Sequence, residues 1–564
     1  MYRFKSKSKI LLGFIFILAI LLRFIWLDKI PPSLYSDEAD QGYNAYSIMK
    51  TGKDEHGVFL PVSLRSFGDW KPPLPSYLMI PAIAIFGLNE FSVRLPSAIF
   101  GVGSVILTFF LIYEIFRNNI FKTKLALLSS FFLTVSPWHI LQSRSAMLVI
   151  IGLFFLEAGI YLFFKARSHP KFLLLSSTSF VLSIYSYYGM RVIAPLLIIY
   201  LISPVILNLF QDLKMLKQVQ HDKYHKMLII SGIIGLIFLQ PLISAFKNNP
   251  DVVFGRARTV SVFYDQGVKL RQWELITQDG MNFPVNLARF FHNNVYLYGR
   301  NILERYFSHL EGNFLFLIGD TSQPFQIPGM GILYPVDGMF ILAGIYIYLV
   351  NFYKKTKIIF YWFTISFIPA AFTFMTPSAN RTFNSVVIFV IFISLGLIYL
   401  LRNIRYKKVF ILGVTFLYII SFNYFLKEYF LVLPVKHADW WNYGWKPATE
   451  YVQKVQSHYN NIVIIDTGGM PYIYFLIYNK YDPGLFQKEA IRSYVSDRFG
   501  FESISSFGKY VFINDRNWHE LKKNPLPDSL YIVSFDQAKD DLNYIQEIEY
   551  PDGKPVLIIY DSSR

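Results

Sequence analysis

The chain has 564 residues, of which 53% are hydrophobic and 18% aromatic, and its mean hydropathy of +0.36 is too high for a soluble protein of this length. The formal charge of +16 does not indicate a nucleic-acid partner, because the lysines and arginines fall mostly in short gaps between apolar runs. The absence of cysteine excludes a disulfide framework and a thiolate metal site. These features indicate a polytopic membrane protein.

The first 27 residues combine a basic tip with an apolar run from Ile10 to Leu27. The run is similar to a secretion signal, but no small-residue cleavage site follows it. At about 1.5 Å per residue it is long enough to cross about 30 Å of hydrocarbon. We therefore expect the first transmembrane helix here, with the N-terminus in the cytoplasm.

Ten further apolar segments are long enough to span the membrane, which gives about eleven transmembrane helices. They lie near residues 98–116, 125–141, 146–164, 172–188, 192–210, 227–246, 337–353, 358–375, 383–401 and 409–426. Counted from a cytoplasmic N-terminus, every inner connection is basic, as cytoplasmic loops require. The count predicts a transmembrane domain over residues 1–433, with long outer loops at 28–97 and 247–336.

The character of the sequence changes near residue 434. Short runs rich in β-branched residues occur in "NNIVIIDTGG", "KYVFIND", "LYIVSF" and "VLIIYD", separated by polar or helical stretches. Such runs are typical of buried strands. The sequence therefore predicts a small extracytoplasmic α/β domain over residues 434–564.

Charged side chains gather at the outer ends of the predicted helices and in the outer loops. They are Asp37, Glu38, Lys71, Arg94, His139, Arg144, Arg191 and Arg381. Each cation taken alone could be a helix-end side chain that reaches for lipid headgroups. Their joint confinement to one side instead indicates a polar cavity beneath a lipid-facing wall.

Such a cavity suits group transfer from a lipid phosphate. Arginine and lysine neutralise a phosphate through charge-assisted hydrogen bonds, and a neighbouring carboxylate can take a proton from a hydroxyl. A lipid phosphate leaves as a stable anion, so one base suffices, whereas glycoside hydrolysis uses two carboxyl groups. The residues therefore favour direct displacement with inversion at the sugar carbon.

At these residues the sequence resembles the bacterial relatives of dolichyl-phosphate-mannose protein mannosyltransferases, the glycosyltransferase family 39 group, which includes enzymes that move aminoarabinose onto lipid A. The motifs include "SDEADQGYNAY", "KPPLPSYLMIPAIAIFGLNEFSVRLPSA", "SPWHILQSRSA", "YSYYGMRVIAP" and "SANRT". The resemblance implies the GT-C fold and a polyprenyl-phosphate sugar donor. It also implies that Asp37 is the catalytic base or an acceptor-orienting carboxylate, and that Glu38 supports it.

The resemblance extends to the cations. Lys71, which precedes Pro-Pro-Leu as in the aminoarabinose relatives, would bind the donor phosphate, and Arg94 matches an arginine that the family needs near its second spanning helix. Arg191 and Arg381 lie where bacterial members also place arginine, and their charge suits the same phosphate. For His139 and Arg144 both acceptor contact and a structural role remain open, and for Arg144 a structural ion pair is favoured.

Helix capping is the alternative role for Asp37 and Glu38, because acidic residues that follow Ser36 suit the first turn of a helix. Asp40 and Gln41 are expected to cap or solvate that helix. No cofactor is predicted with certainty. Relatives that hold a metal carry a carboxylate directly before the lysine, where this chain has Trp70; Asp69 is close, so a divalent metal is left open.

Two functions other than the transfer of one sugar are open to a chain with these features. "HADWWNYGWK", residues 437–446, is similar to the motif with which oligosaccharyltransferases grip an acceptor, which would make Trp441 and Tyr443 acceptor contacts. Asn442 replaces its aspartate and the chain has no Asp-x-Asp pair, so an aromatic cluster that seats the tail domain on the membrane is favoured. A lipid-linked-sugar flippase would place charges deep within its helices, whereas here they lie at one rim.

The sequence thus predicts a multi-pass plasma-membrane enzyme with an extracytoplasmic active site. It is expected to be an inverting glycosyltransferase of the mannosyltransferase type. It would move a single sugar from a polyprenyl-phosphate carrier to a hydroxyl of a protein, lipid or wall polymer.

Overall fold

The computed structural model describes residues 6–212, 219–465, 470–494, 502–513, 518–538 and 543–562. Close packing divides the chain into two compact units. The first unit consists of Met1–Arg23, Phe100–Ser143 and Leu148–Phe425, and the second of Phe24–Ile99, Arg144–Met147 and Leu426–Arg564. This division differs from the predicted boundary after residue 433, because the predicted outer loop 28–97 packs with the tail.

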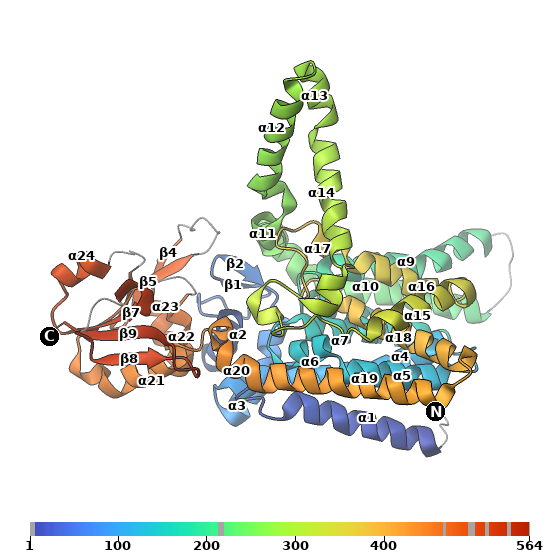
Figure 1. Cartoon of the computed structure of the whole chain (residues 1–564), viewed down its shortest axis with the longest axis horizontal. Helices are drawn as coiled ribbons and strands as arrows, with labels where there is room; N and C mark the ends of the chain where they lie inside the picture. Colours follow the sequence, from blue (N-terminus) through green and yellow to red (C-terminus); the bar gives the residue numbers. More distant parts are fainter. Residues whose placement is uncertain are drawn as a thin grey trace. The chain divides into compact units, whose positions relative to one another are not determined.

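The first unit is helical (Figure 1). The helices that lie wholly or mostly in it are α1 (Ser6–Phe24), α4 (Glu90–Ile115), α5 (Lys122–Val135), α6 (Pro137–Arg144), α7 (Val149–Lys165), α8 (Phe172–Ile184), α9 (Met190–Asp212), α10 (Val219–Asn248), α11 (Asp251–Val260), α12 (Gln266–Gly280), α13 (Val285–Phe291), α14 (Asn294–Ser308), α15 (Asp337–Asn351), α16 (Lys357–Ser366), α17 (Ile368–Ala371), α18 (Val386–Asn403) and α19 (Lys407–Lys427). Short 3₁₀ or π turns are η1 (Val262–Tyr264), η2 (Asn313–Leu317), η3 (Gln323–Phe325) and η4 (Phe383–Ser385).

Each of the eleven apolar segments predicted from the sequence overlaps at least one of these helices. By length and composition alone, four described helices can cross a membrane: Glu90–Ile115, Lys223–Asn248, Phe383–Asn403 and Lys407–Lys436. The pair α5 and α6, bent by 60° at its break, would make a fifth span. The chain is therefore a membrane protein, while the count of eleven spans stays a prediction.

Helices α15 and α18 pack through glycine. A Cβ built on Gly344 would lie 1.9 Å from the Phe392 carbonyl oxygen, and one on Gly396 would lie 2.1 Å from the Phe340 carbonyl oxygen. Small residues of this kind let helix backbones approach closely inside a membrane, where packing drives association. The contact therefore leaves no room for a methyl group at either position.

We expect Gly344→Ala and Gly396→Ala each to lower the free energy of unfolding by about 1–3 kcal/mol, because backbone atoms must move apart. Gly413→Ala in α19 is the matched control, since nothing lies within 4 Å of its built Cβ. Thermal unfolding of the purified variants in detergent checks the prediction. Equal stability of all three variants would contradict the packing described for α15 and α18.

The second unit combines helices with two sheets. Its helices are α2 (Ser36–Thr51), α3 (Leu74–Phe86), α20 (Leu433–Lys436), α21 (Trp445–Val455), α22 (Tyr472–Tyr478), α23 (Pro483–Glu489), α24 (Trp518–Lys523) and α25 (Phe535–Ala538), with turns η5 (Glu428–Val432), η6 (Ala438–Trp441) and η7 (Gln456–His458). Its strands are β1 (Leu64–Ser66), β2 (Asp69–Lys71), β3 (Asn461–Ile465), β4 (Ile491–Ser493), β5 (Ser503–Phe507), β6 (Tyr510–Ile513), β7 (Ser529–Ser534), β8 (Gln546–Glu549) and β9 (Pro555–Asp561).

Strands β1 and β2 form an antiparallel hairpin, and the other seven form one mixed sheet in the order β4-β5-β6-β3-β7-β9-β8. Strand β3 is parallel to both neighbours, and the remaining pairs are antiparallel. The four predicted strands are confirmed as β3, β6, β7 and β9. Residues 466–469 and 514–515, also within the quoted runs, lie outside the described part, and β4, β5 and β8 were not predicted.

The mixed sheet has an apolar core on each face, as the period-two alternation of its central strand requires. Ile462 and Ile464 face a large cluster that includes Tyr43 of α2, whereas Val463 and Ile465 face a smaller cluster. The Tyr43 hydroxyl also donates to the Tyr481 carbonyl at 3.1 Å. The sheet therefore fixes helix α2, which carries the predicted catalytic carboxylate.

Candidate active site

Helix α2 begins with a capping box. The backbone N–H of Tyr35 donates to Glu38 Oε2 at 3.1 Å, and Asp37 and Glu38 supply negative charge to the first turn. Negative charge at this end is favourable because the helix dipole is positive there. The capping role that the sequence analysis weighed for Glu38 is therefore present in the structure.

Asp37 is held by Lys71. The β1–β2 hairpin places Lys71 Nζ 2.6 Å from Asp37 Oδ1 and 3.0 Å from Asp40 Oδ2. Lys71 is buried, and its ammonium lies 4.7 Å from the centre of the Phe67 ring. The Asp37 side chain keeps 42% of its surface exposed, whereas Asp40 is fully buried. The carboxylate of Asp37 is thus accessible to an approaching molecule, whereas the carboxylate of Asp40 is not.

The charges of this group depend on one another. Burial by itself would lower the pKa of Lys71, but Asp37 and Asp40 outweigh burial, so the pKa is raised and the ammonium stays charged. Burial raises the pKa of Asp40 from 3.8 to about 6, against the opposing effect of Lys71. Asp40 Oδ1 also accepts a hydrogen bond from Asn44 Nδ2 at 3.0 Å.

The expectation that Asp40 and Gln41 cap or solvate the helix is wrong, because both side chains are buried. Asp40 instead shares Lys71 with Asp37 and belongs to the site. Its spacing could have shown this: residues three apart lie on the same face of a helix, so the cation that meets Asp37 also reaches Asp40.

The buried Asp40 makes the stability of the chain depend on pH. Its folded pKa of about 6 lies above the ordinary 3.8, so the folded state binds more protons than the unfolded state between these values. Stability should therefore fall as the pH rises from about 4 to about 6, by about 3 kcal/mol, and stay level above. The free energy of unfolding of the unaltered protein and of Asp40→Asn is measured across this pH range. If the difference between the two free energies did not vary with pH, the prediction would be contradicted.

Glu38 and Arg94 form a second, fully buried pair. Arg94 Nε donates to Glu38 Oε1 at 3.2 Å and Nη2 to Oε2 at 3.1 Å, and neither side chain has exposed surface. Glu38 Oε1 also accepts from the backbone N–H of Ala146 at 2.7 Å. The pair therefore joins the start of α2 to α4 and to residues 144–147.

Every N–H group of the Arg94 guanidinium donates a hydrogen bond within the protein. Besides its two bonds to Glu38, it donates to the carbonyls of Leu27 at 3.3 Å, Pro31 at 2.8 Å and Ser33. A guanidinium has five N–H groups, and these contacts account for all of them within the described residues. In this geometry Arg94 offers no N–H group to a lipid phosphate, so the predicted phosphate contact would require it to give up a buried bond.

Arg144 and Trp441 are also interior side chains. Arg144 Nη2 donates to the Ile30 carbonyl at 3.0 Å, and its guanidinium lies 4.9 Å from the centre of the Phe430 ring. Trp441 is fully buried, with its ring 5.8 Å from the Arg94 guanidinium. Trp441 therefore cannot seat the tail domain on a membrane surface, as the sequence analysis expected of this cluster. Tyr443 is half-buried, and its backbone N–H donates to the Ala438 carbonyl at 3.2 Å.

Three predicted site residues belong to the first unit. His139 is buried, with Nδ1 at 2.8 Å from Arg23 Nη2. Arg191 Nη1 donates to the Val252 carbonyl at 2.9 Å. Arg381 Nη1 donates to Thr373 Oγ1 at 2.6 Å and to two carbonyls of the same loop. Their part in a shared cavity with Asp37 and Lys71 stays a prediction.

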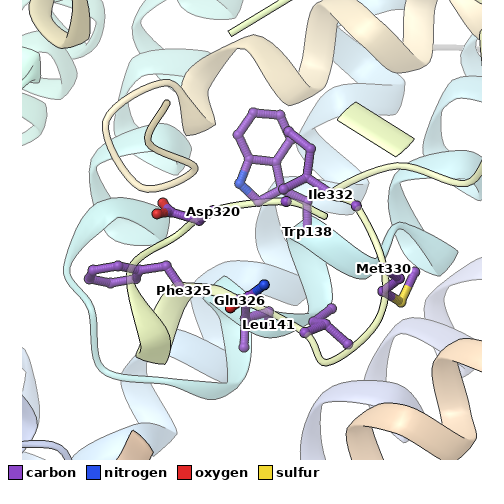
Figure 2. Close-up of a pocket in the computed structure, with 10 residues that line it drawn as sticks. Trp138, Leu141, Asp320, Phe325, Gln326, Met330 and Ile332 are labelled. Atoms are coloured by element: carbon purple, nitrogen blue, oxygen red, sulfur yellow. The ribbon is translucent and has the colours of Figure 1, made fainter. Parts of the chain in front are cut away.

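Two segments of the first unit meet at the "SANRT" turn. Asp320 accepts from the backbone N–H of Ala379 at 2.6 Å, and Trp138 Nε1 of "SPWHILQSRSA" donates to the Ala379 carbonyl at 3.0 Å. Figure 2 shows a small cavity lined by Trp138, Asp320 and the loop after it. Its volume of about 10 Å³ has room for one water and not for a sugar. The cluster therefore orders the turn that precedes Arg381.

No group of three histidine or acidic side chains converges as a metal site would require among the residues that the structure describes. Between Asp37 and Asp40, the place next to both carboxylates is taken by the Lys71 ammonium. The question of a divalent metal, left open by the sequence, stays a prediction.

The fold belongs to the GT-C class. Two crystal structures of ArnT from Cupriavidus metallidurans share it: the form bound to undecaprenyl phosphate has a TM-score of 0.57 at 10% identity over 98% of each chain, and the apo form 0.53 at 11% over 99% of each. At this identity the likeness shows the fold alone.

The family resemblance is confirmed over part of the chain. Residues 13–250 match the model of the dolichyl-phosphate-mannose-protein mannosyltransferase family. A curated relative, "Putative mannosyltransferase YkcB" of Bacillus subtilis (strain 168), is 32% identical over 114 residues, which are 20% of this chain and 15% of that protein. The matched stretch thus spans a small part of that relative, and it includes neither its whole length nor most of this chain.

Proposed function

We propose that the chain is an inverting glycosyltransferase that moves one sugar from a polyprenyl-phosphate carrier to an extracytoplasmic hydroxyl. The observation that carries the proposal is the half-exposed carboxylate of Asp37, held at 2.6 Å by the buried ammonium of Lys71. The ammonium donates to the carboxylate and fixes its direction, and a fixed direction is what a general base requires. The match of residues 13–250 to the mannosyltransferase family supports the same reaction class.

The proposed reaction is a single displacement. The acceptor hydroxyl oxygen bonds to the anomeric carbon while its proton passes to an oxygen of Asp37. The bond between that carbon and the phosphate oxygen breaks, and its electron pair stays on the polyprenyl phosphate. The leaving phosphate is already an anion, so no acid has to protonate it, and attack from the opposite face inverts the anomeric centre.

Lys71 has a second part in this proposal. An ammonium has three N–H groups, and the contacts to Asp37 and Asp40 use two of them. The third can meet a donor phosphate oxygen beside the base. Arg191 and Arg381 remain candidates for the other phosphate contacts. Glu38 and Arg94 act as positioning residues, because their mutual bonds fix the first turn of α2.

A panel of lipid-linked sugar donors tests this function. Purified protein in lipid nanodiscs is incubated with polyprenyl-phosphate and polyprenyl-diphosphate sugars, together with a soluble hydroxyl acceptor. The proposal expects release of the lipid monophosphate. Use of a diphosphate-linked oligosaccharide alone would support an oligosaccharyltransferase, and passage of intact donor across liposomes without release would support a flippase. Either result would overturn the proposal.

A further inference from the structure

The first unit carries a helical hairpin with a defined shape, formed by α12, α13 and α14 (Figure 1). His292 Nε2 lies 2.6 Å from Asp279 Oδ2, and Gln272 Nε2 donates to the His292 carbonyl at 2.8 Å. At the base, Arg305 pairs with Asp265 at 2.7 Å and donates to the Thr373 carbonyl at 2.8 Å. These bonds join its helices to each other and to the helical bundle.

The hairpin exposes more large apolar side chains than a water-facing element tolerates. Val295 is 85% exposed, Met281 78% and Phe290 69%. Other exposed apolar or aromatic side chains on it are Leu270, Trp273, Phe283, Val285, Leu287, Phe291, Tyr296, Leu303 and Phe307. For comparison, Leu236 in the spanning helix α10 is 62% exposed. Contiguous exposed apolar surface of this kind marks a partner or membrane contact.

Cations border this apolar surface. Lys269, Arg271, Arg289 and Arg300 are all exposed on the same three helices. Arg300 pairs with Glu304 at 2.8 Å and Arg271 with Glu274 at 3.6 Å, whereas no ion pair of Lys269 or Arg289 is seen among the described residues. On α14, Tyr296, Leu303 and Phe307 recur at intervals of seven and four, which places them in one stripe, with Arg300 beside it. An apolar stripe beside a basic residue, on a hairpin that also exposes tryptophan and tyrosine, is typical of a helix that lies in a membrane interface.

The direction of the hairpin agrees with a position in the membrane interface. In Figure 1 the helices α5, α18 and α19 run along one common direction, and α12 and α14 extend across it. Spanning helices run along the membrane normal, so an element transverse to them runs along the membrane plane. The hairpin is therefore oriented to lie on a lipid surface and not to project away from it.

We propose that the α12–α14 hairpin is a membrane-interface element that docks on a lipid surface rich in anionic headgroups. Phe290, Phe291 and Val295 enter the acyl boundary, and Lys269 and Arg289 meet lipid phosphates. The lipid surface is favoured over a second copy of the chain because the basic border of the apolar surface complements anionic headgroups.

Single-cysteine labelling tests the proposal, since the chain has no cysteine. Phe290→Cys and Val295→Cys are made in the full chain, labelled with an environment-sensitive fluorophore, and placed one copy per nanodisc of phosphatidylethanolamine and phosphatidylglycerol. Leu236→Cys is the lipid-facing reference, and Lys554→Cys, at an exposed turn between β8 and β9, is the water-facing one.

The proposal expects the labels at 290 and 295 to shift their emission to shorter wavelength, like the label at 236, and to be quenched by nitroxide lipids and not by aqueous iodide. Emission and iodide quenching like those at 554 would overturn it. A blue shift that appears only with two copies per disc would assign the surface to a second copy and would overturn it as well. No outcome depends on glycosyl transfer, so the test is independent of the proposed function.

Discussion

Asp37→Asn is expected to lower the rate of lipid-phosphate release by about 10²- to 10⁴-fold, the range that general bases contribute. The amide keeps the shape of the carboxylate but cannot take the acceptor proton. Folding should change little, because Asp37 is half-exposed and Lys71 retains Asp40 as a partner. Release of polyprenyl phosphate by the purified variant, at saturating donor, measures the effect.

Asp28→Asn is the matched control for this variant. Asp28 is exposed in the same outer segment, so its substitution should leave the release rate unchanged. If Asp37→Asn were folded and released lipid phosphate as fast as the control, the assignment of Asp37 as the base would be wrong. If both variants lost activity together, the loss would be due to the segment and not to the carboxylate.

Replacing either member of the Glu38–Arg94 pair is expected to lower the free energy of unfolding. Arg94→Leu leaves the Glu38 carboxylate buried without its cation, and Glu38→Gln leaves Arg94 without its anion. Breaking a buried pair by removing one partner costs about 3–5 kcal/mol. The double variant should be more stable than the sum of the two losses predicts, because neither charge is then left alone. Unfolding in mixed micelles measures all three.

An exposed ion pair between an arginine and a carboxylate serves as the control. Arg258 Nη1 lies 2.6 Å from Asp251 Oδ1 with both side chains exposed, so Asp251→Asn should change the free energy of unfolding by less than about 1 kcal/mol. If Arg94→Leu were as stable as Asp251→Asn and lost only donor binding, Arg94 would be a phosphate ligand and not a positioning residue.

The sequence identified the elements better than their arrangement. Apolar runs and their spacing were enough to predict helices at α1, α4, α5, α7 to α10, α15, α16, α18 and α19, and β-branched runs predicted β3, β6, β7 and β9. The separate helix α6 was not predicted. The order of the mixed sheet could not be predicted, because strands that are not consecutive in the sequence pair with one another. The packing of α2 on the sheet could not be predicted either, because it depends on contacts between residues more than 400 apart, such as the bond from the Tyr43 hydroxyl to the Tyr481 carbonyl.

The sequence named the residues that the structure brings together and did not predict their pairs; their roles stay predictions. Asp37, Glu38, Lys71 and Arg94 all came from motifs, yet Lys71 was expected on a phosphate and not on Asp37. Which cation meets which carboxylate is decided by the β1–β2 hairpin and the start of α4, whose positions in space no local pattern encodes. Asp40 was missed because its acidic neighbourhood also suits a helix cap.

Chemical rescue of Asp37→Ala by formate shows whether Asp37 is the base, since formate supplies a small carboxylate where the side chain is missing. We expect Asp37→Ala to release almost no polyprenyl phosphate, added formate to restore part of the release, and Asp28→Ala to be unaffected by formate. Release by Asp37→Ala at the rate of the unaltered protein in the absence of formate would contradict this role of Asp37.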